Sequence, residues 1–390
     1  MASAKQPPRA DEGAATDAAS TTMDFKAVLQ AMVARDGSDL HLKVGRPPTF
    51  RVNGELEPMD HPALKPEDLK RLAEQLMTPK QIKLFAEDKE CDFAIGVPDI
   101  GRFRVNLYQQ RGSLCYAMRA IPYQARTLAE LFMPKILEEI AMKPRGLVLV
   151  TGVTGSGKST AMAGMIQHIN ENRSANVITI EDPIEFLHRD IKCHINQREV
   201  GTDTATFGQA LRRVLRQDPD VILIGEIRDL ETLDTALKAA DTGHLVFATL
   251  HTTDATQTIN RVLSFYPPHQ QAEVRFALAS ALQAVVSMRL VPRMDKPGRV
   301  AACEVLINTA AVRDQIRDSA SSLNIPDLIR EGSVQYGMQS FDQSLMQWYS
   351  QKIISFESAM FYATSPAEFA LRTQGIAGSS DTSWSAFEKK

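Results

Sequence analysis

The sequence lacks the marks of a disulfide-bonded, zinc-binding or membrane-spanning protein. Its four cysteines are scattered and form no C-x-x-C pair, which argues against a disulfide framework and against a cysteine zinc site. No apolar stretch reaches the ~18 residues that a transmembrane helix needs. The first residues show no basic segment followed by an apolar one, as a signal peptide would. We therefore expect reduced thiols and a cytoplasmic protein.

An excess of charge of one sign is also lacking. The 44 Lys and Arg residues nearly balance the 47 Asp and Glu residues, which gives a formal net charge of −3. This balance predicts no strong field toward nucleic acid, and no basic groove interleaved with aromatic residues is evident, so we expect no nucleic-acid partner.

The chain of 390 residues is long enough for two or three domains. Residues 1–22, which are rich in Ala, Ser, Thr and Pro, predict a disordered tail, and residues 377–390 predict a flexible one.

Residues 23–120 predict a small α+β domain. Apolar residues at helical spacing begin it, and Asp36-Gly37 ends that helix. Short strands then combine with two helical segments, and Asn53-Gly54 predicts a hairpin turn. The expected strands are 39–43, 49–52, 91–95, 102–108 and 114–120, and the expected helices are 66–77 and 79–87. Residues 121–145 are expected to form a linker.

A different pattern characterises residues 146–376. Continuous apolar runs at 147–151, 177–181, 221–224 and 245–249 alternate with helical segments. Such strands are typical of a parallel sheet covered by helices on both faces, so the predicted fold class is α/β. Beyond Pro292 the chain is expected to be mainly helical, with helices at 310–317, 325–331, 341–349, 356–362 and 367–372.

A complete phosphate-binding loop lies between the first of these strands and its helix. The pattern is G-x-x-x-x-G-K-[ST] in the strand–loop–helix setting that it needs, which indicates a nucleoside triphosphate site. Glycines let backbone N–H groups point at phosphate oxygens, and the helix N-terminus adds partial positive charge. Lys158 is expected to reach the β- and γ-phosphates, and Ser159 to bind Mg²⁺. The expected binding residues are Gly152, Thr154, Gly155, Ser156, Gly157, Lys158, Ser159 and Thr160.

Two acidic residues stand at the ends of other core strands. Glu181 ends one strand and Glu226 follows another, and the carboxyl ends of parallel strands share one edge of a sheet. We interpret Glu226 as the base that orients water opposite the γ-phosphate, and Glu181 as a second acid near Mg²⁺ or the water. In a usual Walker B strand an Asp would be common at the position of Glu226. We therefore do not expect Glu226 to bind the metal directly, and we expect contact through a water molecule. The alternative for each acid is a cap on the next helix.

A histidine stands at each end of the last core strand. About 23 Å of strand separates His244 from His251, and their odd separation points them to opposite faces, so one metal ion cannot bind both. His251 lies at the carboxyl end, where it can contact the nucleotide. A purely structural histidine is the alternative.

Four arginines of the small domain are expected on strands, namely Arg102, Arg104, Arg111 and Arg119. Exposed arginines are usually solvated. The alternative is that they contact a nucleotide bound to the larger domain and act in trans as arginine fingers.

Four stretches resemble, in chain order, the four boxes of the secretion ATPase superfamily. They are Walker A at 152–160, the Asp box at 178–186, Walker B at 221–229 and the His box at 242–251. Over residues 23–376 the chain is most similar to the retraction motors of type IV pili. The resemblance implies a PAS-like N-terminal domain, a RecA-like ATPase domain, ATP and Mg²⁺ as cofactors, and a homohexamer. It also implies that Glu226 is the catalytic glutamate and that Arg104 and Arg119 contact the γ-phosphate.

The same resemblance implies a function. ATP hydrolysis would power pilus retraction and twitching motility at the cytoplasmic face of the inner membrane, through a PilC-like platform protein and in company with a paralogous retraction ATPase. Extension motors carry a tetracysteine module, which this chain lacks. Residues 311–318 depart from a retraction motif at Asp314 and Gln315, which leaves a main motor and an accessory, PilU-like paralogue both open. A nucleic-acid translocase and a non-hydrolysing subunit of a mixed ring are the remaining alternatives.

Overall fold

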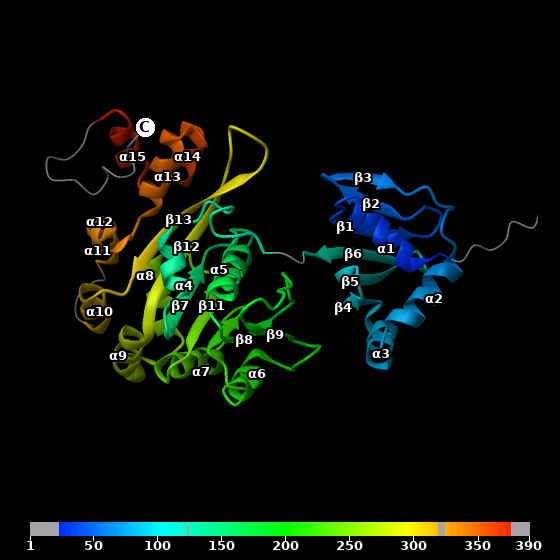
Figure 1. The fold of residues 1–390 in the computed structure, drawn as a ribbon, viewed down its shortest axis with the longest axis horizontal. Helices are drawn as coiled ribbons and strands as arrows, with labels where there is room; N and C mark the ends of the chain where they lie inside the picture. The colour runs from blue at the N-terminus through cyan, green and yellow to red at the C-terminus, as the bar shows by residue number, and fades with distance from the viewer. Residues whose placement is uncertain (1–22, 123–124, 319–323, 376–390) are drawn as a thin grey trace, which may run out of the picture. The chain divides into compact units, whose positions relative to one another are not determined.

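The computed structural model describes residues 23–122, 125–318 and 324–375. Contacts divide the chain into two units with a boundary between Ala120 and Ile121, and Figure 1 labels the elements of both. The two expected tails, 1–22 and 377–390, lie outside the described residues. Each unit has its own sheet and its own apolar core.

The N-terminal unit is a sheet of six strands in the order β3-β2-β1-β6-β5-β4. Strand alternation buries residues such as Leu40 and Phe103 in the core and leaves Arg104 and Arg119 on the other, open face. The strands are β1 (Asp39–Lys43), β2 (Thr49–Val52), β3 (Glu55–Pro58), β4 (Glu90–Val97), β5 (Gly101–Gln110) and β6 (Ser113–Ile121), and the helices are α1 (Phe25–Ala34), α2 (Pro66–Leu76) and α3 (Pro79–Asp88).

Two local expectations for this unit were incomplete. Asn53 and Gly54 form the expected turn with positive φ angles of 49° and 90°, but the strand that follows, β3, was not predicted. All four of its residues are exposed, and two apolar residues, Leu56 and Pro58, are too few to set a strand pattern in the sequence. Arg111 is not on a strand, because it lies in the turn between β5 and β6 with φ of 50°.

The C-terminal unit is a sheet of seven strands in the order β13-β12-β7-β11-β10-β8-β9. Its neighbouring strands pair in parallel from β12 through β9, and only the β12–β13 pair is antiparallel. The strands are β7 (Gly146–Thr151), β8 (Asn176–Glu181), β9 (His194–Glu199), β10 (Val221–Ile224), β11 (Leu245–Leu250), β12 (Leu282–Pro292) and β13 (Arg299–Ile307).

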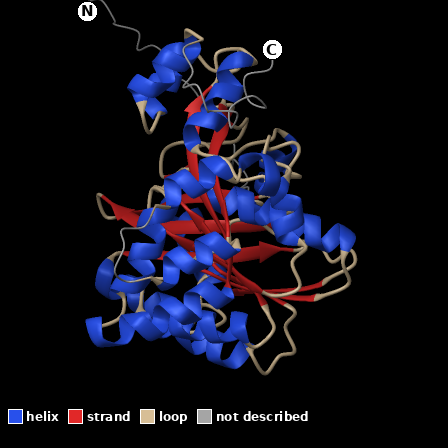
Figure 2. Ribbon diagram, turned by 90° about the vertical axis from the view of Figure 1, so that its left-hand side faces the viewer, coloured by secondary structure: helices blue, strands red, loops and turns tan. Residues whose placement is uncertain are grey.

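Helices cover both faces of this sheet, as predicted (Figure 2). One apolar cluster packs α6 (Phe207–Val214), α7 (Leu230–Asp241), α8 (Ala255–Ser264) and α9 (Gln271–Ala281) against one face. The other cluster packs α5 (Lys158–Asn172) against the opposite face. The α/β fold class is therefore confirmed.

Three strands of the C-terminal unit were not predicted, namely β9, β12 and β13. Strand β13 lies in the region expected to be mainly helical, and together with β12 it forms a hairpin at one edge of the sheet. Their Ala- and Val-rich runs read equally well as buried helix by periodicity alone. Strand β9 at the opposite edge was also missed, because Ile195 is the only apolar residue in His194–Glu199 and gives no apolar pattern.

The segment 121–145 is part of the C-terminal unit and not a free linker. It contains α4 (Ile136–Ala141), whose Leu137 and Ile140 are fully buried in the cluster beside α5. Apolar residues three apart on one helix face account for this packing.

The expected helical part of the C-terminus is present. Two of its residues, Phe341 and Phe369, share an apolar cluster with Val291 and Val300, which face each other in the β12–β13 hairpin. Its helices are α10 (Ala310–Arg317), α11 (Ile325–Glu331), α12 (Ser333–Tyr336), α13 (Phe341–Ser350), α14 (Phe356–Tyr362) and α15 (Pro366–Thr373).

A buried carboxyl in this hairpin predicts a pH dependence of stability. Glu304 on β13 accepts a hydrogen bond from the Ala255 N–H at 2.8 Å, and burial raises its pKa from 4.5 to about 7 against the opposing effects of that N–H and of Arg289. Between these pH values the folded chain holds a proton that the unfolded chain has lost, so stability falls as pH rises. The full effect is about 3 kcal/mol and is reached near pH 7.

We expect Glu304→Gln to remove this loss, so that the unfolding midpoint of the variant falls less than that of the wild type between pH 5 and 8. Thermal unfolding at several pH values measures the difference. Glu273→Gln, on the exposed side of α9, is the matched control and should follow the wild type. If the unfolding midpoints of all three proteins changed with pH in the same way, the pKa of Glu304 would be the same in the folded and the unfolded chain.

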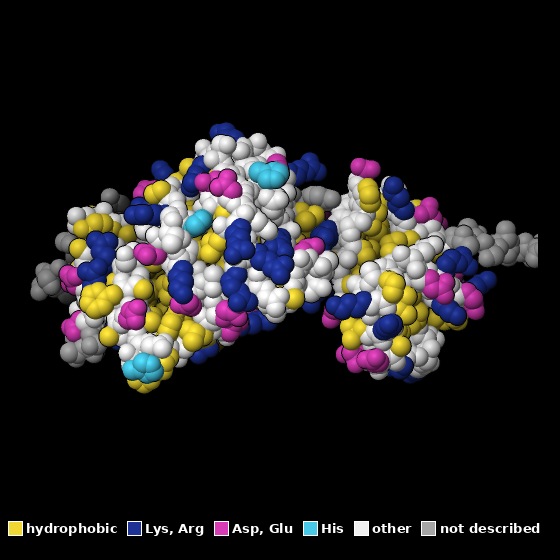
Figure 3. Space-filling model, turned by 90° about the horizontal axis from the view of Figure 1, so that it is seen from below, with side chains coloured by type: hydrophobic (Ala, Val, Ile, Leu, Met, Phe, Trp, Pro, Cys, Tyr) yellow, Lys and Arg dark blue, Asp and Glu magenta, His cyan; other side chains and the backbone are white. Residues whose placement is uncertain are grey.

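The surface carries charges of both signs. On the face drawn in Figure 3, Lys and Arg side chains are interspersed with Asp and Glu on both units. Among residues 23–122, 125–318 and 324–375, no helix is long and apolar enough to cross a membrane.

Candidate nucleotide-binding site

The phosphate loop connects the end of β7 to the first residue of α5. Gly152, Gly155 and Gly157 have positive φ angles of 141°, 77° and 94°. At Gly152 a side chain is impossible for a second reason, because a Cβ would lie 2.5 Å from the Ser156 Oγ and 2.6 Å from the Met288 carbonyl oxygen. The glycines are thus required for the loop to curl over the N-terminus of α5.

Lys158 is buried inside this loop. Its Nζ donates hydrogen bonds to the carbonyl oxygens of Gly152 at 2.7 Å and Val153 at 3.1 Å. Burial lowers the pKa of its ammonium group, although Glu226 and Glu185 act in the opposite direction. The ammonium group therefore lies where a phosphate oxygen can replace a carbonyl oxygen as its partner.

Ser156 supplies a second sign that the loop is built for an anion. Its Oγ is buried and has no hydrogen-bond partner within the described parts of the chain. A buried hydroxyl without a partner is costly unless a ligand satisfies it. This orphaned hydroxyl, together with the curled backbone, fits a phosphate group.

A cavity of about 390 Å³ opens beside the loop, and residues of all four sequence boxes line it. Strands β7, β11, β10 and β8 are consecutive neighbours, so their carboxyl ends form one edge. The expected residues that line the cavity are Thr154, Gly155, Gly157, Lys158, Ser159, Thr160, Glu181, Glu226 and His251.

Glu226 is held at both of its carboxylate oxygens. The His251 Nε2 lies 3.0 Å from Oε1, and Arg228 lies 2.8 Å from Oε2. Arg228 also approaches Asp182 at 3.6 Å. The helix-cap alternative does not apply to Glu226, because Asp229 caps α7 through a hydrogen bond from the Thr232 N–H.

Arg228 is a residue of the site that sequence reasoning missed. It lies within the Walker B stretch two residues after Glu226, but nothing in its spacing indicates that it turns back onto that carboxylate. The hydrogen bond to Glu226 raises the pKa of the guanidinium group. Arg228 therefore acts as a fixed positive charge that orients Glu226.

Glu181 is held in place by its own strand and by a neighbour. Its Oε1 accepts hydrogen bonds from the Thr179 Oγ1 at 2.6 Å and from the Gln197 Nε2 at 3.1 Å. Burial raises the pKa of this carboxyl despite these bonds. The segment after it leads to β9 and not to a helix, so Glu181 is not a helix cap either.

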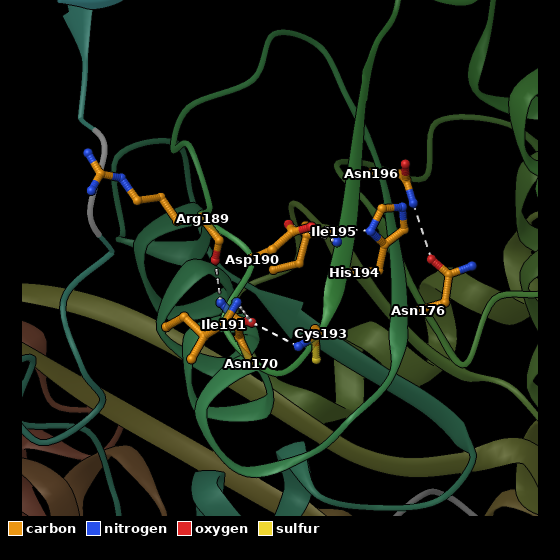
Figure 4. Close-up of polar contacts among 9 residues, drawn as sticks. All are labelled: Asn170, Asn176, Arg189, Asp190, Ile191, Cys193, His194, Ile195 and Asn196. Atoms are coloured by element: carbon orange, nitrogen blue, oxygen red, sulfur yellow. Dashed lines mark hydrogen bonds and ion pairs between the residues drawn. The ribbon is translucent and has the colours of Figure 1, made fainter. Parts of the chain in front are cut away.

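The segment between β8 and β9 forms one wall of the cavity, and α5 anchors it (Figure 4). Asn170, which is fully buried on α5, donates to the Arg189 carbonyl oxygen at 2.7 Å and accepts from the backbone N–H groups of Ile191 and Cys193. In the same segment burial lowers the pKa of His188 to about 4, which keeps this lining residue neutral.

The two histidines of the last core strand have different surroundings. His251 faces Glu226, whereas the His244 Nδ1 contacts the Ala239 carbonyl oxygen at 2.9 Å and serves the structure. Within the described residues no group of three His, Cys, Asp or Glu side chains could hold a metal ion.

The remaining expected site residues lie in the N-terminal unit. Arg104 on β5 and Arg119 on β6 occupy the open face of neighbouring strands. Arg119 is 71% exposed and pairs with Asp39 at 2.8 Å. The residues that line the cavity all belong to the C-terminal unit, so the structure leaves the approach of these arginines to a nucleotide as a prediction.

Comparison with known proteins decides the family. Residues 14–325 match the family described as "Type II/IV secretion system protein". The chain belongs to the type II/IV secretion system protein family. It is 44% identical over 347 residues to the type IV pilus retraction ATPase PilT of Pseudomonas aeruginosa, covering 89% of this chain and 100% of that protein. It is 43% identical over 349 residues to the type IV pilus ATPase PilU of the same organism, covering 90% and 91%.

Solved structures of secretion ATPases agree with this assignment. The crystal structure of the pilus retraction motor PilT with bound ADP superposes with a TM-score of 0.80 at 42% identity, covering 89% of this chain and 98% of that chain. The ATPase DotB of Legionella pneumophila gives a TM-score of 0.68 at 28% identity, covering 86% and 94%. This secretion ATPase is therefore an ATP hydrolase. The architecture implied by the resemblance, a PAS-like N-terminal domain and a RecA-like ATPase domain, is confirmed.

Proposed function

We propose that this secretion ATPase is a hexameric motor that hydrolyses ATP to retract type IV pili. The observation that carries the proposal is the meeting of the phosphate loop, Glu226 and His251 in one cavity, in a chain similar over most of its length to a pilus retraction ATPase.

The geometry supports a stepwise account of hydrolysis. On binding, the Lys158 Nζ exchanges the carbonyl oxygens of Gly152 and Val153 for β- and γ-phosphate oxygens, and the loop N–H groups bind the remaining oxygens. Ser159 would hold Mg²⁺, with Glu226 in contact through water, and the metal would spread the negative charge of the phosphates. Glu226, oriented by His251 and Arg228, keeps lone pairs that can accept a proton from the attacking water.

Arg104 and Arg119 complete the site in trans under this proposal. Both lie on the open face of the N-terminal sheet, where two guanidinium groups can meet the γ-phosphate of a neighbouring subunit. The ring is proposed to work at the cytoplasmic face of the inner membrane on a PilC-like platform protein.

Removal of the protein from its cell tests the direction of the motor. Cells that lack it should carry more surface pili and lose twitching movement, as counted by electron microscopy and by colony spreading. Bald cells would identify an extension motor instead.

An accessory retraction ATPase is a second candidate, because identity to PilU at 43% is close to identity to PilT at 44%. Retraction that persists in the deletion strain and stops only when a paralogue is also removed would favour the accessory role.

The basic helix α10 predicts a variant that separates nucleotide binding from movement. Arg313 donates to the Asn308 carbonyl oxygen at 3.2 Å, and Arg317 lies 5.8 Å from the centre of the exposed Phe276 ring. Arg313→Ala plus Arg317→Ala should leave nucleotide binding intact and impair retraction, because neither arginine is among the residues that line the cavity. Arg261→Ala on α8, which removes an arginine from the face of the Phe265 ring, is the control and should retract normally. Loss of nucleotide binding in the double variant would contradict the prediction.

A further inference from the structure

Arg119 is oriented by an acidic residue that lies far from it in sequence. Asp39 on β1 stands directly opposite Arg119 on β6 in the antiparallel register. The Arg119 Nε donates to the Asp39 Oδ1 at 2.8 Å, across a sequence separation of 80 residues. The pair therefore exists only because the sheet places β1 beside β6.

Asp39 itself has little freedom to move. Its Oδ2 accepts a hydrogen bond from the Ser38 Oγ at 2.8 Å, and its side chain is only 14% exposed. Burial acts to raise the pKa of this carboxyl, but the hydrogen bonds from Ser38 and Arg119 outweigh burial and lower it. Asp39 is thus a fixed and charged anchor.

The contact uses only the inner edge of the guanidinium group. Within residues 23–122, 125–318 and 324–375, neither Nη1 nor Nη2 of Arg119 has a hydrogen-bond partner. The side chain is 71% exposed, so both nitrogens face solvent. An arginine held through Nε still presents its two terminal nitrogens as a fork, which is the geometry that suits phosphate. Arg104 is exposed on the neighbouring strand β5.

We propose that Asp39 is a positioning residue that fixes Arg119 in the orientation needed to contact the terminal phosphate in the site of a neighbouring subunit. This inference rests on the proposed trans action of Arg119. Its physical basis is preorganisation, since an arginine that is already oriented loses less rotamer freedom when it binds phosphate. Small misplacements of a catalytic group can lower rates by about 10²-fold.

The test is ATP turnover by full-length Asp39→Asn, Arg119→Ala and the double variant, each assembled as rings of confirmed size. Asp39→Asn should lower kcat by about 10- to 100-fold with little change in KM for ATP. The double variant should be no slower than Arg119→Ala alone, because Asp39 acts only through that side chain. Asp92→Asn is the matched control, because it removes the charge of a carboxylate that accepts a 3.3 Å hydrogen bond from Asn106 in the same sheet, and it should turn over like the wild type.

Mixed rings add a readout that a purely structural role would not move. Asp39→Asn subunits mixed with Glu226→Gln subunits should regain part of the lost turnover, as Arg119→Ala subunits should. Normal turnover by Arg119→Ala would remove the trans action on which the inference rests. Impaired Arg119→Ala with normal Asp39→Asn would overturn the inference alone. A lowered melting temperature with additive losses in the double variant would also overturn it, because it would assign Asp39 to folding.

Discussion

Replacing Glu226 with Gln is expected to leave nucleotide binding in place and to lower ATP turnover by about 10²–10⁴-fold. The amide keeps the shape of the side chain and can still contact His251, whose Nε2 lies 3.0 Å away. It cannot accept a proton from the attacking water. Turnover of purified rings and binding of a fluorescent ATP analogue measure the two effects separately.

Two further variants make this result specific. Lys158→Ala should abolish or weaken binding as well as turnover, because it removes the ammonium group buried in the loop. Near-normal turnover by Glu226→Gln would place the base elsewhere, and Glu181→Gln would then be the variant to measure. Glu181 lines the same cavity, and burial raises the pKa of its carboxyl.

Mixing two inactive variants is expected to restore activity if the N-terminal arginines act between subunits. A contribution by an arginine finger is typically about 10³–10⁵-fold, so Arg104→Ala rings should be almost inactive. In a ring that also contains Glu226→Gln subunits, a native arginine can face a native Glu226, and part of the turnover should return. Turnover measured over a range of mixing ratios tests this.

The expected dependence on concentration provides a second check. If the site is incomplete without a neighbour, wild-type turnover per subunit should rise steeply with protein concentration as rings form. Absence of rescue at every ratio, in rings shown by mass measurement to be mixed, would contradict action in trans.

The parts of this site that could be predicted from sequence are those that depend on local patterns. The phosphate loop and the strands β7, β8, β10 and β11 are encoded in short runs of apolar residues and glycines. Because parallel strands share an edge, the neighbourhood of Glu181, Glu226 and His251 followed from strand ends alone.

The rest depends on pairings between distant segments. The hairpin β12–β13 reads as either helix or strand until its partner β7 is known. The contact of Arg228 with Glu226 depends on a side-chain rotamer that spacing does not encode. The pair of Asp39 and Arg119 depends on the register of β1 against β6, which no local pattern specifies.

Timed retraction of labelled pili, in a strain whose own copy carries Glu226→Gln, tests the proposed function most directly. The expected result is that pili are assembled and exposed in increased number but retract rarely, because the motor can bind nucleotide without using it. Retraction at the wild-type frequency and speed, with the variant protein present at its normal level, would contradict the proposal that this ATPase powers the movement.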